Sequence, residues 1–152
     1  MVSLEEIYRA LDEQKAQIIP YDFSFAKAAT IACNGRYGVF LSPAATETLS
    51  GLKGCLCHEC GHCATGATHR VDSPYDLVEK HEYKANRWAI ERFLPFDALQ
   101  AALREGFTEP WQLAEYFGLP QDMVEMALHF YTETQQKSFT ETALSLDNPQ
   151  AG

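Results

Sequence analysis

Two histidines and a glutamate within residues 58–62 have the types and the spacing that a catalytic metal site needs. The segment is His58-Glu59-Cys60-Gly61-His62. On an α-helix, residues four positions apart lie on one face, about one turn apart, so both imidazoles can bind one ion while Glu59 lies beside it. The segment predicts a metal-dependent hydrolase with His58 and His62 as ligands and Glu59 as the general base.

The helix that carries this segment is expected to be amphipathic. At about 100° per residue, the histidines lie on one side and the apolar residues on the other, namely Leu49, Leu52, Leu56, Cys60 and Cys63. Histidines that merely fill a core would lie within the apolar side, so their position favours metal binding. Gly61 destabilises a helix by about 1 kcal/mol relative to alanine, which suggests that another segment approaches the backbone there.

A third ligand is expected, because a catalytic zinc usually has three protein ligands and one open position. Residues 77–94 have helical periodicity, and Pro95 ends the predicted helix. On this helix Glu82 shares a side with the apolar residues Val78, Ala85, Ala89 and Phe93. A buried carboxylate without a partner is unfavourable, and a metal ion removes that cost. Glu82 is therefore the predicted third ligand.

Three neighbours of Glu82 are also candidates for roles at the site. Glu79 and His81 are weaker candidates for the third ligand, because they lie about 60° and about 100° away from Glu82 around the helix. Asn86 follows Glu82 by one turn on the same face. Its amide oxygen is predicted to accept the second ring N–H of a ligand histidine and so fix the tautomer of that ring. A solvent-exposed helix residue is the alternative for Asn86.

The two segments together form one pattern over residues 58–95. His58-Glu59-Cys60-Gly61-His62 is followed by Glu82-Tyr83-Lys84-Ala85-Asn86-Arg87-Trp88-Ala89 and by Phe93-Leu94-Pro95. This resembles the ImmA/IrrE family of metallopeptidases, whose pattern is H-E-x-G-H, then E-x-x-A-N/D-x-F-A, then L-x-P. The chain departs from the pattern at Cys60, which is usually aliphatic, and at Trp88, which is usually phenylalanine. Both are expected packing positions.

The resemblance implies a zincin-like endopeptidase with one zinc ion held by His58, His62 and Glu82. Glu59 would accept a proton from a zinc-activated water and pass it to the leaving amine. The implied substrate is a regulatory protein, such as the repressor of a phage, of another mobile element or of a stress response. Several residues remain candidates for a second oxyanion donor, namely His69, Tyr75, His81, Tyr83 and Arg87. A non-hydrolytic anti-repressor is the alternative function, although the presence of Glu59 favours catalysis.

Length and composition predict one small α+β domain that is mainly helical. With 152 residues, 46% of them hydrophobic, the chain can close a single core. The expected domain covers residues 1–137, and residues 138–152 are expected to form a flexible tail. No run of about 18 apolar residues occurs, and the N-terminus lacks a basic and then apolar leader. A cytoplasmic protein that does not enter membranes is therefore expected.

A small β-sheet is expected before the motif helix. A first helix should begin after Ser3, with Glu6 completing a capping box, and end near Gln14. Residues 28–33 and 36–41 are β-prone runs separated by Asn34-Gly35, a strong hairpin signal. Either strand is a candidate for binding an extended substrate by strand addition. An ordinary sheet that only packs on the helices is the alternative.

The last third of the chain is predicted to be helical. Helices are expected over residues 96–104, closed by Gly106, over residues 108–117, capped by Thr108 and ended by Gly118, and from residue 120 to about 135. Helix-turn-helix DNA binding is disfavoured, because residues 105–136 contain no Lys or Arg and the net charge is −9. The expected partner is thus a protein substrate, namely a transcriptional repressor. Binding to nucleic acid or to a membrane is not expected.

Four of the five cysteines, Cys55, Cys57, Cys60 and Cys63, lie close together along the motif helix, and Cys33 lies apart. A structural zinc site or a redox switch is one interpretation of this spacing. However, thiols on one helix that point in several directions do not form a tetrahedron. Packing thiols in a reducing compartment are the favoured interpretation.

Overall fold

The computed structural model describes residues 1–68 and 73–139, and these form an α+β fold with a small sheet ahead of most of the helices. This confirms the predicted α+β class, mainly helical with a small sheet before the motif helix. The elements in order are α1 (Leu4–Glu13), β1 (Ala16–Pro20), β2 (Ala28–Cys33), β3 (Arg36–Leu41), a 3-10 turn η1 (Pro43–Thr46), α2 (Leu49–Thr65), α3 (Tyr75–Phe93), α4 (Phe96–Arg104), α5 (Pro110–Phe117), α6 (Gln121–His129) and a π-helical turn η2 (Phe130–Thr134).

The first helix begins and ends where the sequence predicted. The Ser3 hydroxyl accepts a hydrogen bond from the Glu6 N–H at 3.1 Å, and the helix closes at Gln14. Lys15 has a left-handed φ of 57° and turns the chain into β1. Strand β1 is not predicted from the sequence, and it pairs in parallel with β3 through Ile18 opposite Val39.

The predicted hairpin is confirmed with its register. β2 and β3 are antiparallel from Ala28 opposite Leu41 to Cys33 opposite Arg36. The turn residues Asn34 and Gly35 have φ values of 50° and 74°, as a two-residue hairpin turn with the twist of the strands requires. The strand order is β1-β3-β2, so β3 is the central strand and β2 has a free edge.

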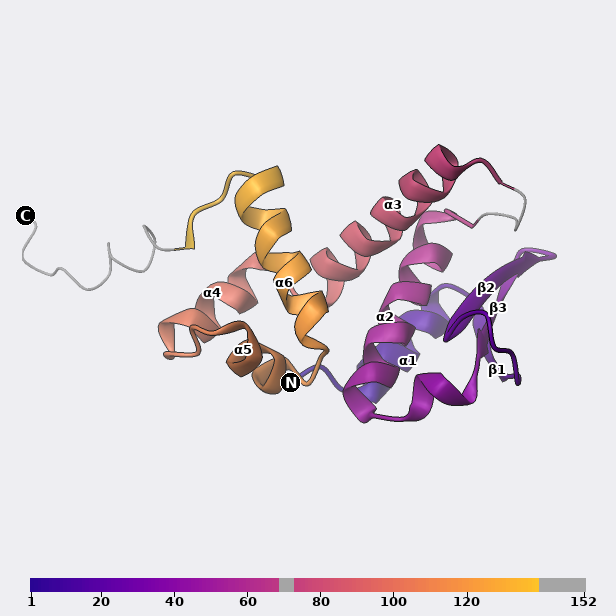
Figure 1. Cartoon of the computed structure of the whole chain (residues 1–152), viewed down its shortest axis with the longest axis horizontal. Helices are drawn as coiled ribbons and strands as arrows, with labels where there is room; N and C mark the ends of the chain where they lie inside the picture. The colour runs from indigo at the N-terminus through magenta and orange to yellow at the C-terminus, as the bar shows by residue number, and fades with distance from the viewer. Residues whose placement is uncertain (69–72, 140–152) are drawn as a thin grey trace, which may run out of the picture.

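The motif helix α2 contacts α1, β2 and α3 and is buried on several sides. Figure 1 shows α2 beside the sheet, with α3 crossing next to it. Thr48 caps its start by accepting from the Gly51 N–H at 3.0 Å, and Gly66 ends it in a left-handed conformation with φ of 63°.

Gly61 permits the closest approach between α2 and α3. A Cβ at this position would lie 2.2 Å from the carbonyl oxygen of Ala85, which is a severe overlap. The expectation that another segment approaches the backbone at Gly61 is therefore confirmed, and that segment is α3. The helix α3 ends just before Leu94 and Pro95, also as predicted.

The last three helices lie together at the end of the molecule away from the sheet (Figure 1). The bounds predicted for α4 hold. The helix predicted from residue 120 to about 135 is α-helical only to His129, and the π-helical turn η2 continues it to Thr134. In α5, the N-cap is Glu109 and not Thr108. Pro110 explains the difference: its fixed φ and missing N–H suit the first helical position, which makes the residue before it the cap. The Gln112 side chain accepts from the Glu109 N–H at 3.0 Å and completes the capping box.

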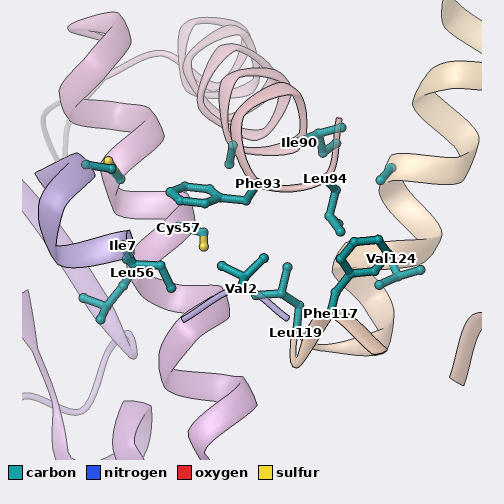
Figure 2. Packing of buried hydrophobic residues seen from close by; sticks show 14 of the residues in the cluster. Val2, Ile7, Leu56, Cys57, Ile90, Phe93, Leu94, Phe117, Leu119 and Val124 are labelled. Atoms are coloured by element: carbon teal, nitrogen blue, oxygen red, sulfur yellow. The ribbon is translucent and has the colours of Figure 1, made fainter. Parts of the chain in front are cut away.

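One cluster of buried side chains connects the two ends of the molecule. It includes Val2 and Ile7, Leu56 and Cys57 of α2, Phe93 and Leu94 at the end of α3, and Phe117, Leu119 and Val124 near α5 and α6 (Figure 2). Within residues 1–68 and 73–139, no helix combines the length and apolar content needed to cross a bilayer.

Two residues of the expected tail belong to the described part of the chain. Phe139 is only 8% exposed, and its ring stacks on that of Phe96 with centroids 4.5 Å apart. Packing against the helices thus extends at least to Phe139. Residues 140–152, the rest of the expected tail, lie outside the described residues.

Candidate metal centre

His58 and His62 of α2 and Glu82 of α3 come together as a group that could hold a metal ion. The Nε2 atoms of His58 and His62 are 3.1 Å apart. Each is also 3.0 Å from an oxygen of Glu82, His58 from Oε2 and His62 from Oε1. In a tetrahedral site with bonds of about 2.0–2.1 Å, ligand atoms are separated by about 3.3 Å. The three side chains are therefore spaced as ligands of one ion would be.

The outer nitrogen of each histidine is held by an oxygen acceptor. His58 Nδ1 is 2.7 Å from Oδ1 of Asn86, the position that the sequence suggested for this amide. His62 Nδ1 is 2.7 Å from the carbonyl oxygen of Ala67. A carbonyl oxygen only accepts, so Nδ1 donates in both contacts and a neutral ring then carries its lone pair on Nε2. Two such lone pairs and a carboxylate converge on one point, which a cation would stabilise.

The electrostatics of the group agree with this arrangement. Hydrogen bonds from His58 and His62 hold the pKa of Glu82 well below its usual range. Burial disfavours the charged form of His58, but the contacts with Glu82 and the nearby charge of Glu59 outweigh burial and raise the pKa of the imidazole. In both residues the surroundings favour the charged form, so a positive charge beside Glu82 is favoured, whether it is a proton on the imidazole or a bound cation.

Glu82 is less buried than the sequence analysis expected. Its side chain is 39% exposed, whereas Ala85 and Ala89 on the same side of α3 are buried. Helical periodicity gives the direction of a side chain but not how far the neighbouring elements extend over it. Glu82 thus lies at the margin of the contact between α2 and α3, open to the cavity described below.

Glu59 lies beside the three ligands and is only 6% exposed. Its Oε2 accepts a hydrogen bond from the hydroxyl of Thr30 on β2. The sequence analysis did not identify Thr30, because 29 residues separate it from Glu59 and no local motif marks the contact. A carboxylate held in this way next to His58 has the position expected for a general base.

The candidate ligands line a cavity of about 790 Å³. One wall consists of residues 25–31, from Phe25 to Ile31 in β2, and the opposite wall includes Pro120, Asp122, Met123 and Met126 at the start of α6. The cavity size is in the range of small-molecule and peptide-binding clefts. The metal group thus opens into a largely apolar cleft between β2 and α6.

The other candidates from the sequence that the structure describes lie outside this cleft. Glu79 is exposed and bonds with Tyr75 on the same helix. Arg87 pairs with Glu91 at 3.2 Å. Of the five candidate oxyanion donors, Tyr75, His81, Tyr83 and Arg87 are absent from the described cavity lining, and His69 lies outside the described residues.

The cysteines form no second metal group within residues 1–68 and 73–139. All five are free thiols, and Cys57, Cys60 and Cys63 are buried in the core side of α2. Burial raises the pKa of Cys60 to about 12 and that of Cys63 to about 11, which keeps both thiols protonated at neutral pH. This is the behaviour of packing side chains.

Compared with known proteins, the chain matches no family model, no curated protein sequence and no solved structure.

Proposed function

We propose that this protein is a zinc-dependent endopeptidase of the ImmA/IrrE type, with a zincin-like arrangement of its motif helix. The observation that supports this most is the convergence of His58, His62 and Glu82 beside a buried, hydrogen-bonded Glu59. Two imidazoles and one carboxylate are a donor set of catalytic zinc sites, with the fourth position left for water or substrate. Manganese and iron accept similar ligands, so metal analysis of the purified protein has to decide between them.

Each residue around the ligands has a chemical role in this proposal. A bound zinc would supply a Lewis acid and lower the pKa of a water molecule to about 7. Glu59 would act as the general base that accepts a proton from the attacking water and as the acid that donates it to the nitrogen of the leaving amine. Asn86 and the Ala67 carbonyl hold the rings of His58 and His62 in the tautomer that binds metal.

The substrate is proposed to bind as an extended strand along β2. Strand addition requires a free edge, and β3 has none because it pairs with β1 on one side and β2 on the other. Of the two strands of the hairpin, only β2 can therefore bind a peptide in this way. The cleft runs along residues 25–31 and passes the metal group, which would bring a peptide on β2 close to Glu59.

The proposed partner is a transcriptional repressor in the cytoplasm, and the proposed outcome is its cleavage. A net charge of −9 disfavours direct binding of nucleic acid, which agrees with a regulator that acts on a protein. The second candidate function is an anti-repressor that binds without hydrolysis. The burial and hydrogen bond of Glu59 favour hydrolysis, since binding alone needs no base in that position.

The deciding experiment uses zinc-loaded protein and candidate transcriptional repressors, taken first from the reading frames next to the gene of this protein. Glu59→Gln should bind zinc as the wild type does and lose at least 100-fold in cleavage rate, in line with the contribution of a general base. Glu79→Gln is the matched control, because Glu79 is exposed and lies outside the cavity. Relief of repression by Glu59→Gln at wild-type level, without cleavage, would support the binding function instead.

A further inference from the structure

Thr30 lies where the free edge of β2 meets the candidate base. The Ser42 N–H donates to the Lys27 carbonyl at 2.9 Å, so this pair is a hydrogen-bonded one in the antiparallel ladder. Hydrogen-bonded and non-hydrogen-bonded pairs alternate along such a ladder. Thr30, opposite Val39, is three positions further along β2 and belongs to a non-hydrogen-bonded pair. Its own N–H and C=O therefore point away from β3, toward the free edge.

The side chain of the same residue reaches the carboxylate of Glu59. The Thr30 hydroxyl donates to Glu59 Oε2, and the Cys63 thiol lies close to the same hydroxyl. Glu59 and Cys63 lie one turn apart on α2, and both are buried. Contacts on both sides fix the rotamer of the hydroxyl, and the hydroxyl in turn fixes the direction of the carboxylate.

Thr30 also lines the cavity, together with Ala29 and Ile31 on the same strand and His58 and Glu59 on α2. A peptide added to the edge of β2 would therefore form backbone hydrogen bonds with the residue whose hydroxyl orients the base. Thr30 would thus contact both the bound peptide and the carboxylate of Glu59. This link between peptide and base requires no motion of the protein.

We propose that Thr30 is a positioning residue that aligns Glu59 with a peptide bound on β2. This inference rests on the proposed endopeptidase function and adds to it a role for the strand. Replacing the hydroxyl with a methyl group keeps the backbone edge and the volume but removes the hydrogen bond to Glu59. Peptide affinity should then persist while turnover falls.

The test compares Thr30→Val, Thr30→Ser and the matched control Thr46→Val. Thr46 donates only to the nearby Pro43 carbonyl in η1, and it does not line the cleft. We expect Thr30→Val to lower kcat about tenfold or more, because a misaligned general base loses part of its contribution to the rate. KM should stay within about twofold of the wild-type value. Thr30→Ser should recover most of kcat because it retains the hydroxyl. Zinc affinity should be unchanged in all three.

A second readout uses metal-free protein and needs no cleavage. Thr30→Val should lower Tm in the wild-type background and have little effect in a Glu59→Ala background, because the partner is already missing. Equal shifts in both backgrounds, or wild-type kcat for Thr30→Val alongside inactive Glu59→Gln, would overturn the inference while the endopeptidase function stands. Cleavage that continues in Glu59→Gln would instead refute the proposed function and with it the role of Thr30.

Discussion

Replacing Gly61 with alanine would force α2 and α3 apart at the point where they carry the candidate metal ligands. The added Cβ would lie 2.2 Å from the Ala85 carbonyl oxygen, with the carbonyl carbon and Cα of Ala85 at 2.8 and 3.0 Å. All three atoms belong to the backbone, so no side-chain rotation relieves the overlap. Glu82 is one turn before Ala85 on the same helix and has to move with it.

The size of the effect follows from that distance. A relaxed carbon to oxygen contact is about 3.3 Å, so the helices must separate by about 1 Å. Metal ligands tolerate deviations of only about 0.2 Å, which places Glu82 out of reach of an ion bound by the histidines. We expect zinc affinity to fall at least tenfold, or about 1.4 kcal/mol. Overpacking destabilises by about 1–3 kcal/mol, offset by about 1 kcal/mol from the helix propensity of alanine.

Two measurements separate these effects. Competition with a chromophoric chelator gives the zinc affinity, and urea unfolding of metal-free protein gives the stability. Gly51→Ala is the control for zinc affinity on the same helix, because its Cβ would meet only the side chain of Thr48, at 2.7 Å from Oγ1, and not the backbone of α3. Rotation of Thr48 would break its cap hydrogen bond with the Gly51 N–H, so this control is expected to lose stability but to keep its zinc affinity. A Gly61→Ala protein with wild-type zinc affinity would refute the proposed link between this contact and the site.

Two further predictions concern the hydrogen bonds around the core and the site. Asn86→Ala should weaken zinc binding by about 10–100-fold without unfolding the protein, because it removes the acceptor of the His58 ring N–H; chelator competition measures this, and unchanged affinity would count against the contact. Burial raises the pKa of Tyr131 to about 12, against about 10 in an unfolded chain. The unfolded state therefore loses this proton first, so stability should fall as pH rises from about 10 to 12. Urea titrations should show a shallower fall for Tyr131→Phe, and an equal fall would contradict the assignment.

Local patterns predicted the parts of the fold that local interactions determine. Asn34-Gly35 determined the hairpin, since few other residue pairs adopt two consecutive positive φ values. The spacing of His58 and His62 likewise predicts that both side chains lie on one face of the helix, and this follows from helical geometry alone. Glu82 does lie with His58 and His62, but the helical pattern favoured it for a partly wrong reason, because Glu82 is on the expected side of α3 and is not buried.

The features that the sequence did not reveal depend on contacts between distant segments. β1 has only five residues, and it exists as a strand because β3 pairs with it in parallel. Thr30 gains its importance from the packing of β2 on α2, and the Ala67 carbonyl from the left-handed turn at Gly66 that ends α2. A backbone acceptor carries no residue-type signal, so periodicity and motifs have no means of identifying it.

The helices α2 and α3 each supply different side chains to the candidate metal centre, so the group forms only when both motif segments are present. The helix α2 supplies the two rings and the base, and its Gly61 admits the backbone of α3. The helix α3 then supplies Glu82 and, one turn later, Asn86, so one helix face provides both a ligand and the acceptor that orients the ring of His58. The His62 side chain is 6% exposed and that of Glu82 is 39% exposed. An ion entering from the cleft would therefore meet the carboxylate before the inner ring, so the half-exposed position of Glu82 suits a ligand better than the buried position expected from the helical pattern.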